Sequence, residues 1–306
     1  MSYHKRVIVH APGKINLTLQ ITGIAANGYH LLESVMHSFG PGDLVTLEMS
    51  PEYGNISVSC SRNGVPEDNT NIAHKAATAF FASAGIGQRG LHIHIEKIIP
   101  PEAGLGGGSA NAAAVLRGLN VMFGASHSDK SLSDKSLSDE ALREIGSGIG
   151  ADVPFCITGG CALAQGIGDK LTALPMLEGC YIAIAKPPGG MSTALAYRLY
   201  DEKAGVIPKT ETTAAMIDNI SRGDIASVGK CMSNVFEHIS GRETARIKSA
   251  MMRAGAVGAV LSGSGSAVAG LFPNEQSARE CLTGLTDCEI LLATPVKTGA
   301  VVVRVE

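Results

Sequence analysis

At residues 101–114 the chain reads Pro101-Glu-Ala-Gly-Leu-Gly-Gly-Gly-Ser-Ala-Asn-Ala-Ala-Ala114, a pattern typical of a strand end, a glycine loop and the start of a helix. The glycines remove Cβ atoms where a backbone comes close to a ligand or takes a positive φ. The alanine-rich stretch from Ser109 through Leu119 has high helix propensity. The first turn of a helix leaves N–H groups unpaired and carries about half a positive charge, so we expect this loop to hold an anion, most naturally a phosphate.

The loop differs from the two common nucleotide-binding motifs. No lysine follows its glycines, as a P-loop requires, and Ser109 stands where a dinucleotide fingerprint needs a third glycine. A glycine-rich turn that only lets a helix pack closely on a sheet is therefore an open alternative at this point.

Composition predicts a soluble cytoplasmic protein. The 306 residues are enough for two domains or one large α/β domain. Net charge is −3 and Lys and Arg are scattered, so we expect no nucleic-acid partner. The seven cysteines have neither C-x-x-C nor Cys/His metal spacing, which predicts reduced thiols. The apolar run at the N-terminus is too short for a signal peptide, and no window approaches the ~20 apolar residues of a membrane helix.

Apolar periodicity predicts strands and helices that alternate irregularly along the chain. Strands are expected at 7–9, 16–21, 43–49, 55–60, 91–95, 162–164, 181–185, 256–261, 267–272 and 301–305. Helices are expected at 71–84, from the glycine loop to about 122, and at 139–146, 192–202, 212–222, 225–232, 242–254 and 277–284. Without a regular βαβ repeat, this order predicts an α+β fold. A five-residue repeat at 128–138 is interpreted as a duplication in a surface loop, where added length is well tolerated.

Polar residues in an early strand need an explanation beyond packing. In Ala11-Pro-Gly-Lys-Ile-Asn-Leu17, Lys14 and Asn16 share one strand face, and Ile15 and Leu17 share the other. A lysine on an inward face is costly unless it meets an anion. The alternative is a solvated lysine on an edge strand.

Further segments are also candidates for a site. Asn27-Gly-Tyr-His30 predicts a hairpin turn that offers a stacking ring and an imidazole, or turn chemistry alone. Asp152, in Gly150-Ala-Asp-Val-Pro-Phe155, could orient or deprotonate a hydroxyl if a lysine pairs with it, or could simply be a turn or N-cap carboxylate. Leu261-Ser-Gly-Ser-Gly-Ser-Ala267 could approach a ligand closely or form a tight bend.

The order and spacing of these segments resemble the superfamily of galactokinase, homoserine kinase, mevalonate kinase and phosphomevalonate kinase (GHMP kinases). Its signatures correspond here to residues 12–16, 101–110 and 262–266. Within it, the chain is similar over residues 11–272 to the kinases of the non-mevalonate isoprenoid route that act on a cytidylyl methylerythritol. The resemblance implies a two-domain α+β architecture, with a ribosomal-protein-S5-like ATP-binding domain at 1–158 and a ferredoxin-like substrate domain at 159–306. It also implies ATP-dependent phosphorylation of a small molecule.

The resemblance assigns roles position by position. Asp152 would accept the proton of the C2 hydroxyl, while Lys14 stabilises the oxyanion and keeps Asp152 ionised. The substrate contacts that it implies are Asn16, Tyr29, His30, Thr193 and Tyr197, with Tyr29 and Tyr197 stacking on cytosine. The ATP contacts that it implies are Asn71, Ile72 and Lys97 at the adenine and Gly104, Leu105, Gly106, Gly107, Gly108 and Ser109 around the phosphates. Mg²⁺ is expected for charge neutralisation.

The chain departs from the family pattern in places. Asn27 stands where the family usually has aspartate, and Ala110 replaces a second serine. The repeat at 128–138 lengthens a connection away from every motif, where we expect no catalytic effect. The rivals are a homoserine or mevalonate type of kinase, a ligand sensor that has lost its base, and a dinucleotide-dependent oxidoreductase. Tyr29 and Tyr197 favour a cytidylyl substrate, and the presence of Asp152 disfavours a sensor.

Overall fold

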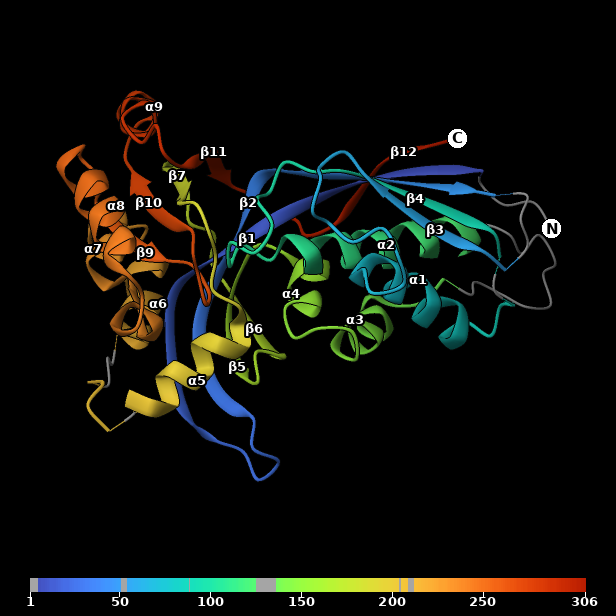
Figure 1. Cartoon of the computed structure of the whole chain (residues 1–306), viewed down its shortest axis with the longest axis horizontal. Helices are drawn as coiled ribbons and strands as arrows, with labels where there is room; N and C mark the ends of the chain where they lie inside the picture. Colours follow the sequence, from blue (N-terminus) through green and yellow to red (C-terminus); the bar gives the residue numbers. More distant parts are fainter. Residues whose placement is uncertain (1–4, 51–53, 88, 125–135, 204, 209–211) are drawn as a thin grey trace.

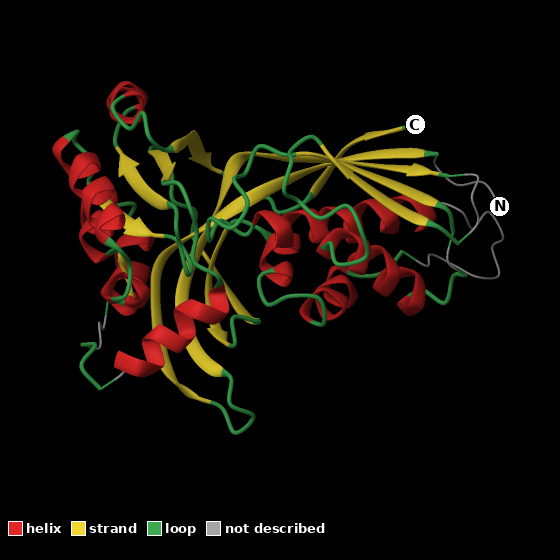
Figure 2. Cartoon of the chain, in the orientation of Figure 1, coloured by secondary structure: helices red, strands yellow, loops and turns green. Residues whose placement is uncertain are grey.

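The computed structural model describes residues 5–50, 54–87, 89–124, 136–203, 205–208 and 212–306. These residues form an elongated molecule in which two helix-covered parts of a mixed sheet lie end to end (Figures 1 and 2). The expected α+β class and two-domain architecture are confirmed.

Two long antiparallel strands, β1 (Arg6–Ile24) and β2 (His30–Met49), run through both parts (Figure 1). The apolar periodicity predicted shorter, separate strands at 7–9, 16–21 and 43–49. The pairing instead continues past Pro12 through a register shift between Ala11 and Gly13. Residues 40–42 of β2 lie opposite Pro12 alone, and such an irregularity bends the strands without ending their pairing.

The N-terminal part is a sheet with helices on one face (Figure 2). Strand β4 (Leu91–Glu96) lies beside β2, β3 (Ile56–Cys60) lies beside β4, and β12 (Val301–Val305) lies beside β1. The helices are α1 (Ile72–Ser83), α2 (Gly107–Gly124), α3 (Asp139–Ser147) and α4 (Val153–Thr158). One apolar core joins them to the sheet, centred on the alanines of α2 and the valines and leucines of β1, β2 and β4.

The C-terminal part has its own sheet, which joins the first where β11 meets β2. Its strands are β7 (Tyr181–Lys186), β9 (Gly258–Leu261), β10 (Val268–Phe272) and β11 (Glu289–Pro295), in the order β11-β7-β10-β9. Its helices are α6 (Thr213–Ser221), α7 (Ile225–Cys231), α8 (Arg242–Arg253) and α9 (Glu275–Thr283). Further elements around β1 and β2 are β5 (Cys161–Gly166), β6 (Lys170–Leu174), β8 (Ser233–Asn234), a 3₁₀ turn (Val235–His238) and α5 (Thr193–Lys203).

Helices α1 and α3 begin within one residue of their predicted starts, and a side chain caps each of them. Asn71 accepts a hydrogen bond from the Ala73 N–H at the start of α1, and Ser138 accepts one from Ala141 at the start of α3. Helix α2 begins at Gly107, two residues before the expected start at Ser109. Of the repeat at 128–138, residues 128–135 lie outside the described residues.

The division of the chain into two domains at 158/159 stays a prediction. At this point the chain packs against the segment that leads into β12. Gly159 and Gly160 have φ of +71° and +76°. A Cβ on Gly159 would lie 1.9 Å from the backbone nitrogen of Gly299, on the segment that leads into β12. Because β12 pairs with β1, the end of the chain lies in the N-terminal part.

Candidate active site

A cavity of about 1010 Å³ lies where β1, the glycine loop, α4, α5 and the turn after β9 meet. Most of the residues singled out from the sequence line it. They are Lys14, Asn16, Tyr29, His30, Ile72, Gly104, Leu105, Gly106, Gly107, Gly108, Ser109, Asp152, Thr193 and Tyr197. Because Gly263 also lines the cavity, segments more than 200 residues apart in the chain contribute to one site.

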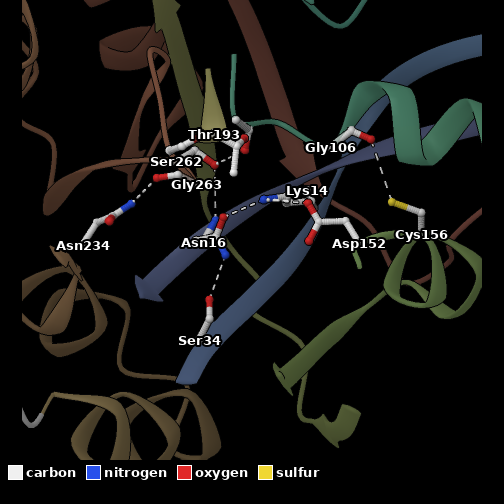
Figure 3. A network of polar contacts seen from close by, with 12 residues as sticks. Lys14, Asn16, Ser34, Gly106, Asp152, Cys156, Thr193, Asn234, Ser262 and Gly263 are labelled. Carbon is white, nitrogen blue, oxygen red and sulfur yellow. Dashed lines mark hydrogen bonds and ion pairs between the residues drawn. The ribbon is translucent and has the colours of Figure 1, made fainter. Parts of the chain in front are cut away.

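Lys14 and Asp152 form an ion pair in this cavity (Figure 3). Lys14 is 4% exposed, and its Nζ lies 3.2 Å from Asp152 Oδ2. The same ammonium donates to Asn16 Oδ1 at 2.8 Å, and Asn16 in turn donates to Ser34 Oγ at 2.8 Å. Lys14 is thus an inward-facing lysine that meets an anion, not a solvated one.

Asp152 occupies the N-cap position of α4 but makes no capping hydrogen bond with its side chain. That side chain keeps 35% of its surface exposed, beside the buried Lys14. A carboxylate left free of the helix end, paired with a lysine and open to a cavity can accept a proton from a bound hydroxyl.

The glycine loop folds over Lys14. Gly104 and Gly106 have φ of +74° and +68°, which favour glycine. A Cβ on Gly106 would lie 2.7 Å from Lys14 Cγ. The first N–H groups of α2 have no carbonyl of their own helix to bond, and Gly107, Gly108 and Ser109 at this end line the cavity. The loop therefore does more than pack a helix on a sheet.

The turn at 262–265 closes on the same lysine from the other side. Ser262 Oγ donates to the Gly104 carbonyl at 2.9 Å. Gly263 has a φ of +54°, and a Cβ there would lie 3.3 Å from Lys14 Nζ. Two glycine segments that are about 160 residues apart in sequence thus touch each other and enclose Lys14 (Figure 3).

An aromatic group forms the far wall of the cavity. The His30 ring lies 4.7 Å from that of Tyr197, and Tyr197 packs edge-on against Phe236. Burial, with a smaller contribution from the Asp152 carboxylate, raises the pKa of Tyr197 to about 12, which keeps its phenol protonated. Tyr29 is 63% exposed, and its turn is held by a hydrogen bond from its N–H to Asn27 Oδ1.

No sequence pattern pointed to the residue that orients His30. His30 Nε2 lies 2.7 Å from Asp201 Oδ1, on α5 and 171 residues away. Thr193, at the start of α5, bonds through its hydroxyl with Ser264 at 3.1 Å. Only the fold brings α5 to both the hairpin turn and the glycine turn, so no local pattern could reveal these pairs.

Two residues expected at the adenine have side chains directed elsewhere. Lys97 forms a buried ion pair with Asp43 and donates to Asn111 Oδ1 at 3.0 Å. Its ammonium lies behind the loop, 2.9 Å from where a Gly107 Cβ would be. Asn71 caps α1 and donates to the Pro66 carbonyl. Of the three expected adenine contacts, Ile72 lines the cavity wall.

Other features of the described residues bear on the site. The cysteines are free thiols, as expected, and burial raises the pKa of Cys156, whose Sγ faces the Gly106 carbonyl. Ala110 is 1% exposed and belongs to the core under the sheet. No described helix has both the length and the apolar character that a bilayer span requires.

The chain matches two family models, GHMP kinases N terminal domain over residues 71–160 and GHMP kinases C terminal over residues 216–288. It is 38% identical over 276 residues to the 4-diphosphocytidyl-2-C-methyl-D-erythritol kinase of Clostridium tetani, covering 89% of this chain and 93% of that protein. It is 40% identical over 275 residues to the kinase of that name from Caldicellulosiruptor saccharolyticus, covering 89% and 90%.

A solved structure of a 4-(cytidine 5'-diphospho)-2C-methyl-D-erythritol kinase superimposes with a TM-score of 0.73 at 28% identity, covering 95% of this chain and 98% of that one. The sequence-based prediction of an ATP-dependent small-molecule kinase is confirmed. The chain belongs to the GHMP kinases and, within them, to the 4-diphosphocytidyl-2-C-methyl-D-erythritol kinase family.

Proposed function

We propose that this chain transfers the γ-phosphoryl group of ATP to the C2 hydroxyl of 4-diphosphocytidyl-2-C-methyl-D-erythritol, the compound in the name of its relatives. The observation that carries the proposal is the Lys14–Asp152 pair, 3.2 Å apart, in a cavity with a glycine loop on one side and an aromatic wall on the other. A kinase of this substrate needs a base, a phosphate cradle and a nucleobase site together.

Asp152 takes the proton from the C2 hydroxyl as the phosphoryl group is transferred. Lys14 keeps the base ionised, because a neighbouring ammonium favours the charged carboxylate. Asn16 and Asp152 accept two of the three ammonium hydrogens, which leaves one for the reacting oxygen or the γ-phosphate. Phosphoryl transfer depends mainly on positioning and charge stabilisation, and the two glycine segments hold this ammonium in place.

The phosphates of ATP bind along Gly104, Leu105, Gly106, Gly107, Gly108 and Ser109, at the N-terminus of α2. The adenine lies beside Ile72. Asn71 and Lys97 do not contact it with their side chains but support this end of the site, Asn71 by capping α1 and Lys97 through its ion pair with Asp43.

The cavity has oxygen ligands suited to Mg²⁺. Glu102, Asp152 and Ser109 all line it, and Mg²⁺ in kinases is held by one or two carboxylates together with substrate phosphates. Within the described residues no group of three or more His, Cys, Asp or Glu forms a metal cage of its own. Glu102 and Ser109 would hold the ion beside the phosphates, where it neutralises charge.

The cytidylyl end binds at the aromatic wall. The exposed ring of Tyr29 and the packed ring of Tyr197 offer the stacking faces, and His30 meets the base edge with the ring nitrogen that Asp201 does not bind. Thr193 and Asn16 lie on the path from this wall to Asp152 and contact the rest of the substrate.

Purified protein incubated with ATP and Mg²⁺ tests the proposal. The cytidylyl substrate, homoserine and mevalonate are supplied separately, ADP release is followed, and phosphorus NMR identifies the product. We expect turnover of the cytidylyl substrate to its 2-phosphate. Turnover of homoserine or mevalonate instead would refute the substrate assignment while leaving the kinase class intact.

A further inference from the structure

Asn234 is a buried polar residue behind the site to which no role has yet been given. It lies in β8, a two-residue strand that pairs with β1 opposite Leu19, and it is 4% exposed. It does not line the cavity, so it cannot touch the substrate itself.

The Asn234 amide uses both of its hydrogens on the glycine turn. Nδ2 donates to the Leu261 carbonyl and to the Gly263 carbonyl, each at 2.7 Å. Figure 3 shows the second of these bonds. Oδ1 accepts from the Phe236 N–H at 2.9 Å. Only an amide of this size supplies two donors and one acceptor in this arrangement. The two bonded carbonyls lie on either side of Ser262.

Ser262, between the two carbonyls that Asn234 binds, connects the turn to the phosphate loop and to β1. It is fully buried, donates to the Gly104 carbonyl at 2.9 Å and receives the Asn16 N–H at 3.4 Å. The next residue, Gly263, lies against Lys14 Nζ. One asparagine therefore fixes the turn that touches the phosphate loop, the strand of the site and the ammonium.

We infer that Asn234 is a positioning residue for phosphoryl transfer, which acts through the Ser262–Gly263 turn to set the phosphate loop and Lys14 relative to each other. This inference rests on the proposed function of the site. A misplacement of ~1 Å in such a constellation can reduce a rate by ~10²-fold. The effect belongs in kcat, because Ser262 and Gly263 contact the phosphate loop and Lys14, whereas the turn meets α5 through the next residue, in the Ser264–Thr193 bond.

Two substitutions and their combination test the inference. Asn234→Asp keeps the shape but puts a carboxylate oxygen against two carbonyls, and Ser262→Ala removes the bond to Gly104. We expect each to lower kcat by ~10- to 10²-fold with KM for both substrates within ~3-fold, the pattern of a lost transition-state interaction. Because both act through one turn, the double variant should lose little more than the worse single one.

Asn120→Asp is the matched control. Asn120 is another buried asparagine, which donates to the Leu137 carbonyl at 2.9 Å and accepts from its N–H at 2.7 Å, away from the cavity. It should lose stability, measured by urea unfolding, and keep kcat within ~2-fold.

Equal kcat losses in Asn120→Asp and Asn234→Asp, or multiplicative losses in the double variant, would overturn the inference. If Asn234→Asp does not fold, Ser262→Ala alone decides, and a wild-type kcat there refutes the coupling. The wild-type assay separates this result from the proposed function. If the wild-type enzyme phosphorylates a different acceptor, the substrate assignment is refuted. The two single variants and the double variant are then compared on that acceptor.

Discussion

Replacing Gly106 with alanine should disable phosphoryl transfer while leaving the protein folded. The new Cβ would stand 2.7 Å from Lys14 Cγ, where ordinary contact begins at about 3.4 Å, so the lysine side chain must move by several tenths of an ångström or more. A displacement approaching ~1 Å costs ~10²-fold in rate, or about 2.7 kcal/mol of transition-state stabilisation. We expect Gly106→Ala to lower kcat by up to that factor in steady-state assays with both substrates saturating.

Gly64→Ala separates the contact from backbone strain. Gly64 has a φ of +84° against +68° for Gly106, but a Cβ there would meet nothing within 4 Å. Both variants should lose about 1–2 kcal/mol of unfolding free energy from the left-handed backbone. Only Gly106→Ala should lose kcat. A kcat for Gly106→Ala that is equal to that of Gly64→Ala would refute the claim that the loop presses on Lys14.

Further predictions concern the nucleobase site, a departure from the family pattern and a buried histidine. Tyr29→Ala should raise KM for the cytidylyl substrate by ~5- to 10²-fold, the worth of one stacked base, and leave KM for ATP unchanged; equal rises would contradict the stacking. Ala110→Ser, which restores the usual serine, should not raise kcat, because residue 110 faces the core; a clear gain would show that this position reaches the ligand. Burial lowers the pKa of His37 below its ordinary 6.5, and its Nε2 accepts the Leu177 N–H, so the folded state holds the neutral ring. Stability should therefore fall as pH drops below about 6.5, by up to ~1.4 kcal/mol per pH unit, and a urea titration of His37→Gln should show a smaller fall; an unchanged fall would contradict this assignment.

The sequence predicted those parts of the fold whose cause is local. The caps Asn71 and Ser138 mark helix starts because a side chain bonds the next turn. The continuity of β1 and β2 escaped prediction, because the register shift between Ala11 and Gly13 depends on the pairing of the two strands and not on the local apolar pattern.

The residues of the candidate site also fall into those that a local pattern could single out and those that only the fold reveals. Lys14, Asp152 and the glycine loop could be singled out because each is unusual in its own segment, as a lysine among apolar strand residues, a carboxylate in an apolar run and a run of glycines. The resemblance to the family then assigned their roles. Asp201 and Asn234 could not, because an aspartate on a helix and an asparagine in a short strand are ordinary until the fold brings their partners within 3 Å.

The kcat of Asp152→Asn with ATP and the cytidylyl substrate tests the central claim, that Asp152 held by Lys14 takes the proton of the acceptor hydroxyl. The amide keeps the size of the side chain and removes the base. We predict a fall in kcat of at least ~10²-fold, with both KM values within ~3-fold of wild type. A kcat near that of wild type would contradict the claim.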